Sequence, residues 1–362
     1  MHGVGSRMDQ ETRSERVSCP IATQATVRSF FSRTTAYQVM RAVRYHDGGE
    51  PAVLRVEECE RPEPERDEVL IEMRAASINP VDAKLREQGA PRLPKTTGSD
   101  IAGIVAAVGT DVDDYEAGDR VFATGLHVGR FAGGAFADFA TVPTDLVATL
   151  PDGVSFEEGA AVALVGVTVW RAMIHHARLE PGETAFIHGG NGGVGHVAVG
   201  LANALGARAV STARPTYHDD VRRLGAETVL DYTRDDLPEA AIEATGGADV
   251  VLDPMAGTYL ETDIEIAGYN GDVSIIAGEE AALSNLSAAR SKEIDIHMMS
   301  MSNLATHSDA PNIGPILERF GRLIAEDRLE VVIDRTYPLE DAIAAHRAVM
   351  EDSFLGKIVL TP

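Results

Sequence analysis

The sequence predicts an α/β protein with two domains: a strand-rich domain, and a doubly wound parallel sheet of the kind that binds nucleotides. Short β-rich segments fill the first part of the chain, and apolar strands alternate with helical segments in the second. A glycine-rich loop joins the first of these apolar strands to its helix. With 362 residues and 44% hydrophobic content, the chain can bury a large core.

The strand-rich part spans residues 40 to about 151. Its short β-rich runs, among them VLRVEE, DEVLIEMRAASI and DIAGIVAAVG, are separated by Gly, Pro and Asp. This spacing predicts a partly open barrel or a rolled sheet. The pattern then changes, because Ser155 followed by Glu158 forms a capping-box signature and a long apolar helix comes next.

The second part is predicted to be a parallel sheet with helices on both faces. TAFIHGG, RAVSTA, ETVLDY, DVVLDP and DVSIIAG have the composition of strands buried on both sides. GVGHVAVGLANALGA and TYHDDVRRLGA are predicted helices that stop at Gly. Two more helices and the closing strand KIVLTP are expected to return to the first domain. The predicted domains are therefore residues 40–164 with 306–362, and residues 165–305.

Residues 1–39 differ in composition from the rest of the chain. They contain five Arg against three Asp plus Glu, and their polar residues follow neither a helix nor a strand period. We expect a disordered N-terminal extension. Either the native chain starts at Met40 and this stretch results from a mis-assigned start, or the stretch is a dispensable tail. Both explanations are favoured over a targeting peptide.

The net charge of −24 limits the classes of partner, because an acidic surface disfavours nucleic-acid phosphates and anionic membranes. Only four of the 32 basic residues are Lys. Such a surface is typical of halophilic proteins, so a salt requirement is one hypothesis and an ordinary acidic protein is the other. No run of about 18 apolar residues is present, which predicts a cytoplasmic protein and no membrane contact.

The loop GGNGGVG carries the GxGxxG pattern on Gly190, Gly192 and Gly195. It follows a predicted strand and opens a predicted helix, which is the setting of a dinucleotide site. The glycines permit a tight turn, a close approach of the backbone to a pyrophosphate, and close packing of helix on strand. The helix N-terminus also favours phosphate. A purely structural turn is the alternative.

The end of the next strand indicates which dinucleotide is bound. NAD sites place Asp or Glu there, whereas AVSTARPTY holds Arg214, whose guanidinium can pair with a 2′-phosphate. Tyr232, at the end of the third strand, can add its hydroxyl. These residues favour NADPH over NADH. For Arg214, the alternative is an ordinary exposed arginine.

Several stretches in order resemble the medium-chain dehydrogenase/reductase superfamily, and within it the zinc-independent, zeta-crystallin-like quinone oxidoreductases. The stretches that carry this resemblance include AASINPVDAKLREQG, TTGSDIAGIVAAVG, AGDRVFA, GGAFADFATVP, PGETAFIHGGNGGVG and GKIVLTP. The resemblance implies a GroES-like catalytic domain, a Rossmann domain and a homodimer that acts on a small molecule.

Zinc-containing members place a cysteine ligand where this chain has INPVD, and a His-Glu pair where it has GSD. Here these places hold Asn79, Ser99 and Asp100. Cys19 and Cys59 have no metal-ligand spacing, so no metal site is predicted. Without a Lewis acid, reduction of an electrophilic acceptor is chemically easier than oxidation of an alcohol.

The resemblance therefore implies hydride transfer from NADPH to a quinone, with the Asn79 carboxamide donating to the developing oxyanion. The alternative for Asn79 is an Asn-Pro turn that only starts a helix. The resemblance also implies that Thr168 faces the nicotinamide. The predicted cofactor site comprises Thr168, Gly190, Asn191, Gly192, Gly193, Val194, Gly195, Thr212, Arg214, Tyr232, Gly278 and Lys357, the last with a surface lysine as its alternative.

Two other functions remain open. One is reduction of an enone or enoyl substrate with the same cofactor, although Ala90 and Pro91 stand where some such reductases carry a tyrosine. The other is NADPH binding without turnover. His175 and His176 lie on a predicted helix without i, i+4 partners, so no metal site is expected there. His188 is expected to pack at the end of its strand rather than to act in catalysis. Met298, Met299 and Met301 are expected to fill a strand interface near an edge, such as one where two subunits meet.

Overall fold

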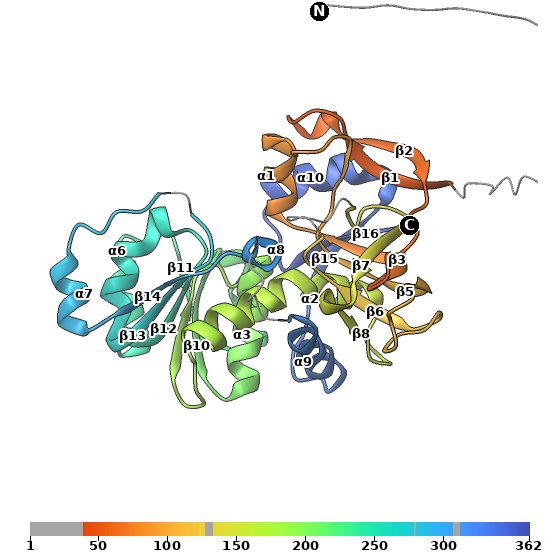
Figure 1. Cartoon of the computed structure of the whole chain (residues 1–362). Helices are drawn as coiled ribbons and strands as arrows, with labels where there is room; N and C mark the ends of the chain where they lie inside the picture. The colour runs from red at the N-terminus through yellow and green to blue at the C-terminus, as the bar shows by residue number, and fades with distance from the viewer. Residues whose placement is uncertain (1–38, 127–132, 279, 307–311) are drawn as a thin grey trace, which may run out of the picture. The chain divides into compact units, whose positions relative to one another are not determined.

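Two sheets organise the chain in the computed structural model, which describes residues 39–126, 133–278, 280–306 and 312–362 (Figure 1). The predicted N-terminal extension lies outside these residues except for Val39. One sheet is mixed and belongs to the strand-rich part, and the other is entirely parallel. The predicted α/β fold class, a GroES-like domain with a Rossmann domain, is confirmed.

The strand-rich part is built around β3, the central strand of a seven-stranded sheet. The strand order is β15-β16-β3-β5-β6-β8, with β7 also paired to β3, and β2-β1-β4 form a smaller sheet. β3 has neighbours on both sides, and most of its residues are buried. The bounds are β1 Val39–Tyr45, β2 Arg55–Glu60, β3 Glu68–Ile78, β4 Lys95–Thr96, β5 Ile101–Val108, β6 Arg120–Ala123, β7 Phe139–Pro143, β8 Val147–Thr149, β15 Ile333–Pro338 and β16 Lys357–Thr361.

The last strand of the chain joins this first sheet. β16 pairs antiparallel with β3, with Ile358 opposite Ile78 and Leu360 opposite Ala76. This register brings Lys357, the first residue of β16, to the end of β3, where Asn79 follows. Residues almost 280 positions apart are therefore neighbours.

The second sheet has six parallel strands in the order β11-β10-β9-β12-β13-β14. The order reverses between β9 and β12, and ligands of such sheets bind outside the carboxyl ends of the strands at that switch point. The bounds are β9 Thr184–Ile187, β10 Arg208–Ala213, β11 Ala226–Asp231, β12 Ala248–Asp253, β13 Ala267–Ile275 and β14 Asp295–Met298.

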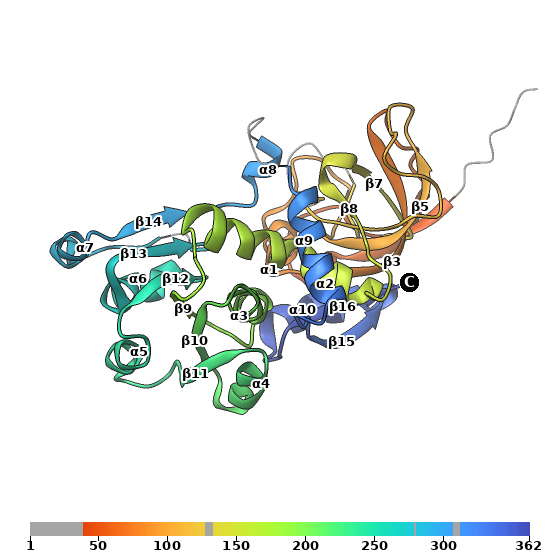
Figure 2. The same ribbon diagram turned by 90° about the horizontal axis from the view of Figure 1, so that it is seen from below.

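The long apolar helix α2, Phe156–Val169, begins at the predicted capping box. The Glu158 N–H donates to Ser155 Oγ at 3.2 Å, and the Ser155 N–H donates to Glu158 Oε2 at 2.8 Å. The helix continues through residues 170–176 in wider π-helical turns. It packs on β3, β5 and α3, and α9 lies beside it (Figure 2).

Ten α-helices are found in the described residues, and none of them is long and apolar enough to cross a membrane. The sequence pattern does not predict strands β14 and β15, because both are edge strands in which at least half of the residues are polar and none is fully buried. The helix bounds are α1 Pro80–Gln88, α2 Phe156–Val169, α3 Gly193–Leu205, α4 His218–Arg223, α5 Leu237–Thr245, α6 Ala256–Ile266, α7 Leu286–Lys292, α8 Asn303–Thr306, α9 Gly314–Ala325 and α10 Ala342–Glu351.

Candidate functional site

The glycine loop, residues 189–195, joins β9 to the first turn of α3, and two of its glycines are packed too closely to carry a side chain. A Cβ at Gly190 would lie 2.4 Å from Ser211 Oγ, and one at Gly195 would lie 2.1 Å from the Gly189 carbonyl oxygen. Gly189 itself has a φ of +67°. Glycine is therefore required at position 190 for contact between the loop and β10, and at position 195 for contact between α3 and the preceding turn.

The first turn of α3 can receive an anion. Its N-cap residue, Gly192, has no side chain to cap the helix, and the first N–H groups of any α-helix lack an intrahelical acceptor. The helix dipole adds partial positive charge at this end. The N–H groups of Gly193, Val194 and Gly195 belong to this turn.

Other predicted cofactor residues lie along the same edge of the parallel sheet. Thr212, at the end of β10, accepts the Gly189 N–H on its hydroxyl at 3.0 Å. Arg214 follows that strand and is exposed, and its guanidinium has no hydrogen-bond or ion-pair partner among the described residues. Tyr232 follows β11, and Gly278, whose φ is +124°, follows β13. The structure brings these residues to the carboxyl ends of the strands.

The return segment before β16 is bound to the glycine loop. Asn191 donates from Nδ2 to the Phe354 carbonyl at 3.1 Å, and the Gly356 N–H donates to the Asn191 carbonyl at 2.9 Å. A Cβ atom added to Gly193 would lie 3.1 Å from the Cδ atom of Lys357. The Cγ1 atom of Val165, on α2, would lie 3.7 Å from the same added Cβ. Thr168 is buried about one turn further along α2.

A buried polar cluster surrounds Asn79 beside this loop. Asn79 Nδ2 donates to Ser99 Oγ at 2.9 Å and to Asp100 Oδ2 at 2.7 Å. Lys357 Nζ donates to Asn79 Oδ1 and to the Ile78 carbonyl, the latter at 3.0 Å. We call this group the Asn79 cluster; its members, all buried, are Ser77, Asn79, Asp82, Ser99, Asp100, Thr124 and Lys357.

The two carboxyl groups of the Asn79 cluster have different surroundings. Asp100 accepts from Ser77 Oγ at 2.6 Å and from Thr124 Oγ1 at 2.5 Å. Asp82 accepts the Asn79 N–H at 2.9 Å, while its Oδ1 has no partner among the described residues. Burial raises the pKa of both groups, and for Asp82 the added charge of Asp100 brings the pKa to about 7. Asp82 therefore takes up a proton near neutral pH.

Lys357 balances this buried negative charge. Burial lowers the pKa of Lys357, and the nearby carboxylates of Asp100 and Asp82 act in the opposite direction. An ammonium has three N–H groups, and two acceptors are seen here, so one N–H is not used by these bonds. The Asn79 cluster can thus orient and polarise a neighbouring oxygen atom and hold a proton at Asp82.

The structure shows why Asn79 admits two interpretations. It is the N-cap of α1 and also the centre of the cluster. Both of its amide N–H groups already donate within the protein, so donation to a substrate requires the exchange of one partner. The sequence analysis missed Asp82, which the capping pattern with Asn79 could have revealed. Ser77 and Thr124 carry no local signal.

A second buried cluster lies below the glycine loop. His188, which follows β9, is paired through Nε2 with Asp263 Oδ1 at 2.7 Å and stacks on Tyr259 with ring centroids 4.1 Å apart. Asp253, at the end of β12, accepts the Met255 N–H at 2.6 Å. Burial lowers the pKa of His188 to about 4 and raises those of Asp253 and Asp263 to about 7. His188 is enclosed in the core.

Comparisons with known proteins agree with this geometry. Residues 65–152 match the alcohol dehydrogenase GroES-like domain, and residues 224–360 match a family described as zinc-binding dehydrogenase. The chain is 31% identical over 337 residues to a quinone oxidoreductase of Mus musculus, which covers 90% of this chain and 99% of the relative.

Solved structures show the same fold. An Escherichia coli quinone oxidoreductase complexed with NADPH has a TM-score of 0.79 and 28% identity, covering 89% of this chain and 100% of that chain. An NAD-dependent alcohol dehydrogenase has a TM-score of 0.80 and 28% identity, covering 89% of this chain and 99% of that chain. From the matched domains and the full-length relatives, the chain belongs to the zeta-crystallin-like quinone oxidoreductase family of the medium-chain dehydrogenase/reductase superfamily.

Proposed function

We propose that this protein is an NADPH-dependent oxidoreductase that reduces a quinone without a catalytic metal ion. The observation that carries the proposal is the position of Lys357. Its stem lies against Gly193 of the glycine loop, and its ammonium donates to Asn79. One side chain therefore connects the predicted cofactor site with the buried polar groups.

The residues at the carboxyl edge of the parallel sheet fit NADPH. The glycine loop and the first turn of α3 would hold the pyrophosphate, and the unpaired guanidinium of Arg214 would bind the 2′-phosphate. No Asp or Glu stands at the end of β10, where an NAD site has one. When bound, NADPH supplies the hydride. The relative from Escherichia coli, solved with NADPH, supports this assignment.

The Asn79 cluster supports chemistry without zinc. Asn79 and Ser99 stand at two of the places where zinc-containing relatives have ligands, and neither is among the usual zinc ligands. Both hydrogen-bond within the cluster. A quinone is already electrophilic, so hydride transfer to it needs stabilisation of the developing oxyanion, and one proton then completes the hydroquinone. We propose that Asn79 and the unused N–H of Lys357 provide it.

A homodimer is proposed from the exposed edge of the parallel sheet. β14 is the last strand of the sheet, and its outer edge has no partner among the described strands. Met298 on this strand is 76% exposed, and Tyr269 on β13 is 67% exposed. An unpaired edge with exposed apolar side chains is suited to pairing with a second copy.

An acceptor and coenzyme panel tests the proposed function. Purified protein is given NADPH or NADH with quinones, enones or simple aldehydes, and loss of the nicotinamide absorbance is followed. We expect turnover with quinones and a preference for NADPH. Faster turnover with enones would assign the protein to the enone reductases. NADPH binding without oxidation by any acceptor would indicate a binding protein.

A further inference from the structure

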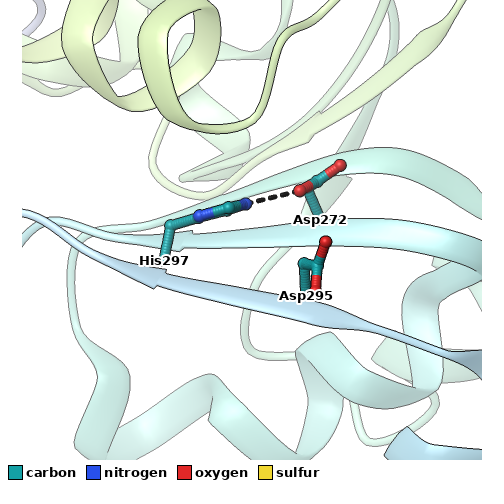
Figure 3. A group of neighbouring side chains, drawn as sticks. All are labelled: Asp272, Asp295 and His297. Carbon is teal, nitrogen blue, oxygen red and sulfur yellow. Dashed lines mark hydrogen bonds and ion pairs between the residues drawn. The ribbon is translucent and has the colours of Figure 1, made fainter.

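A group of metal-ligand side chains lies on the outer strands of the parallel sheet, separate from the Asn79 cluster. It consists of Asp272 on β13 and of Asp295 and His297 on β14 (Figure 3). One ligand atom from each side chain lies within 4.8 Å of the others. His297 Nε2 and Asp272 Oδ1 are 2.5 Å apart.

Strand geometry places the three side chains on one face of the sheet. Asp272 is the register partner of Asp295, and Ser274 is the partner of His297. Residues two apart on a strand share a face, so all three point the same way. Ser274 Oγ donates to the carbonyl of Ala172, so this face is covered by the segment that continues α2. The three side chains that offer metal ligands are therefore held in place by two hydrogen-bonded strands.

The same segment brings a second imidazole to the group. His176 lies with its ring centroid 5.8 Å from that of His297. From the sequence, no metal site is expected at His176, because its own helix offers no partner at metal-ligand spacing. The structure supplies the partner from β14, 121 positions further along the chain.

The carboxylate of Asp295 is otherwise unexplained. It makes no hydrogen bond or ion pair with the described residues, yet it stands beside a second carboxylate, that of Asp272. A bound cation would neutralise both carboxylates and use the imidazole as a neutral ligand.

We propose that Asp272, Asp295 and His297 bind a divalent transition-metal ion, with Zn²⁺ as the test ion. A mixed set of carboxylate oxygens and an imidazole nitrogen suits Zn²⁺, whereas Mg²⁺ and Ca²⁺ prefer oxygen ligands only. Zinc–ligand bonds of about 2.0–2.2 Å place tetrahedral ligand atoms about 3.3 Å apart. Rotation of the side chains about the fixed strands is enough to reach this arrangement. His176 is the nearest candidate for a fourth ligand.

The position of the ion implies a structural role. β14 is the edge strand and lies three strands away from β9, which the glycine loop follows. An ion at Asp272, Asp295 and His297 would join β13 to the edge strand β14 and restrain it. It would not contact the Asn79 cluster, so hydride transfer should not depend on it.

The test is a calorimetric titration of Zn²⁺ into chelator-treated protein. Wild type should bind one equivalent at this site, and Asp295→Asn and His297→Gln should each lose affinity by about tenfold or more. His46→Gln is a matched control. His46 also pairs with a carboxylate, that of Glu57 at 2.7 Å, but this pair belongs to no group of three metal-ligand side chains in the described residues. This control should bind as wild type does.

Thermal unfolding supplies an independent readout. Zn²⁺ should raise the Tm of wild type and of His46→Gln, and should raise that of Asp295→Asn much less. Asp295 is exposed, so its substitution should leave the fold intact in the absence of metal. The proposal is overturned if wild type binds no stoichiometric Zn²⁺, or if all four proteins bind it with equal affinity.

Discussion

The glycine loop and the Asn79 cluster meet at Lys357 but are built from different groups. The loop offers main-chain N–H groups and is so closely packed that an added Cβ at Gly195 would overlap the Gly189 carbonyl. The cluster consists of side chains, with two buried carboxyls and one buried ammonium. The loop is therefore sensitive to atoms added at Gly190 or Gly195, and the cluster is sensitive to the removal of a charge.

The largest effect is expected from removing the shared side chain. Lys357→Met takes the cation away from Asp100 and Asp82 and leaves Asn79 Oδ1 without its donor. We expect quinone-dependent turnover to fall about 100-fold or more. We also expect the free energy of unfolding to fall by about 3 kcal/mol, because breaking a buried charge pair leaves the other charge unpaired. Steady-state kinetics and denaturant unfolding measure the two effects.

A second variant separates stability from catalysis. Lys357→Met combined with Asp100→Asn removes both charges, so part of the lost stability should return while turnover stays low. If Lys357→Met alone retains turnover within a factor of two of wild type, Lys357 does not connect the two regions functionally.

The loop should respond to a single added methyl group. Gly195→Ala places a Cβ about 2 Å from a carbonyl oxygen, whereas Gly200→Ala, on the same helix, makes contacts of 3.4 Å or more. We expect Gly195→Ala to destabilise the protein by about 2 kcal/mol or more and to weaken NADPH binding. Gly200→Ala should be neutral or slightly stabilising. Equal behaviour of the two variants would contradict the packing described for the loop.

Arg214 tests the choice of coenzyme. Charged hydrogen bonds contribute about 1.5–3 kcal/mol, so Arg214→Ala should lower kcat/KM for NADPH by roughly 10- to 100-fold. The value for NADH should hardly change. Arg222→Ala is the control. Arg222 lies on the nearby helix α4 and pairs with Asp219 of the same helix. An equal loss with both coenzymes would show that Arg214 does not bind the 2′-phosphate.

The smallest effect concerns the cluster below the loop. Burial, and then the charge of Asp263, raise the pKa of Asp253 to about 7, compared with about 3.9 in an unfolded chain. Between about pH 4 and pH 7 the folded state binds more protons than the unfolded state. The contribution of Asp253 to the free energy of unfolding is therefore complete below about pH 4 and is lost as the pH rises through 7.

Asp253→Asn removes this dependence because the amide stays neutral. At pH 8 we expect the variant to be more stable than wild type by about 1–2 kcal/mol, since the two coupled carboxyls share the effect. At pH 5 the difference should be small. Asp219→Asn, a fully exposed site, serves as control in the same unfolding experiments. A variant that is less stable at pH 8 would show that the carboxylate is well accommodated.

The fold and the cofactor loop were predictable because their signals are local. The capping box at Ser155, the apolar strands and the glycine spacing each lie within a short stretch and fix the backbone there. The Asn79 cluster was only partly predictable. Its members come from four separate stretches of the chain, and Lys357 reaches Asn79 only because β16 pairs with β3. The ligands on β13 and β14 were missed for the same reason, since register brings them together.

The central claim is that the Asn79 cluster acts without a metal ion. Its most direct test is the rate of quinone-dependent NADPH oxidation by protein from which metal has been removed with a chelator, before and after Zn²⁺ is added back. We expect the full rate without metal and no gain from Zn²⁺. A rate that disappears with the chelator and returns with Zn²⁺ would contradict it.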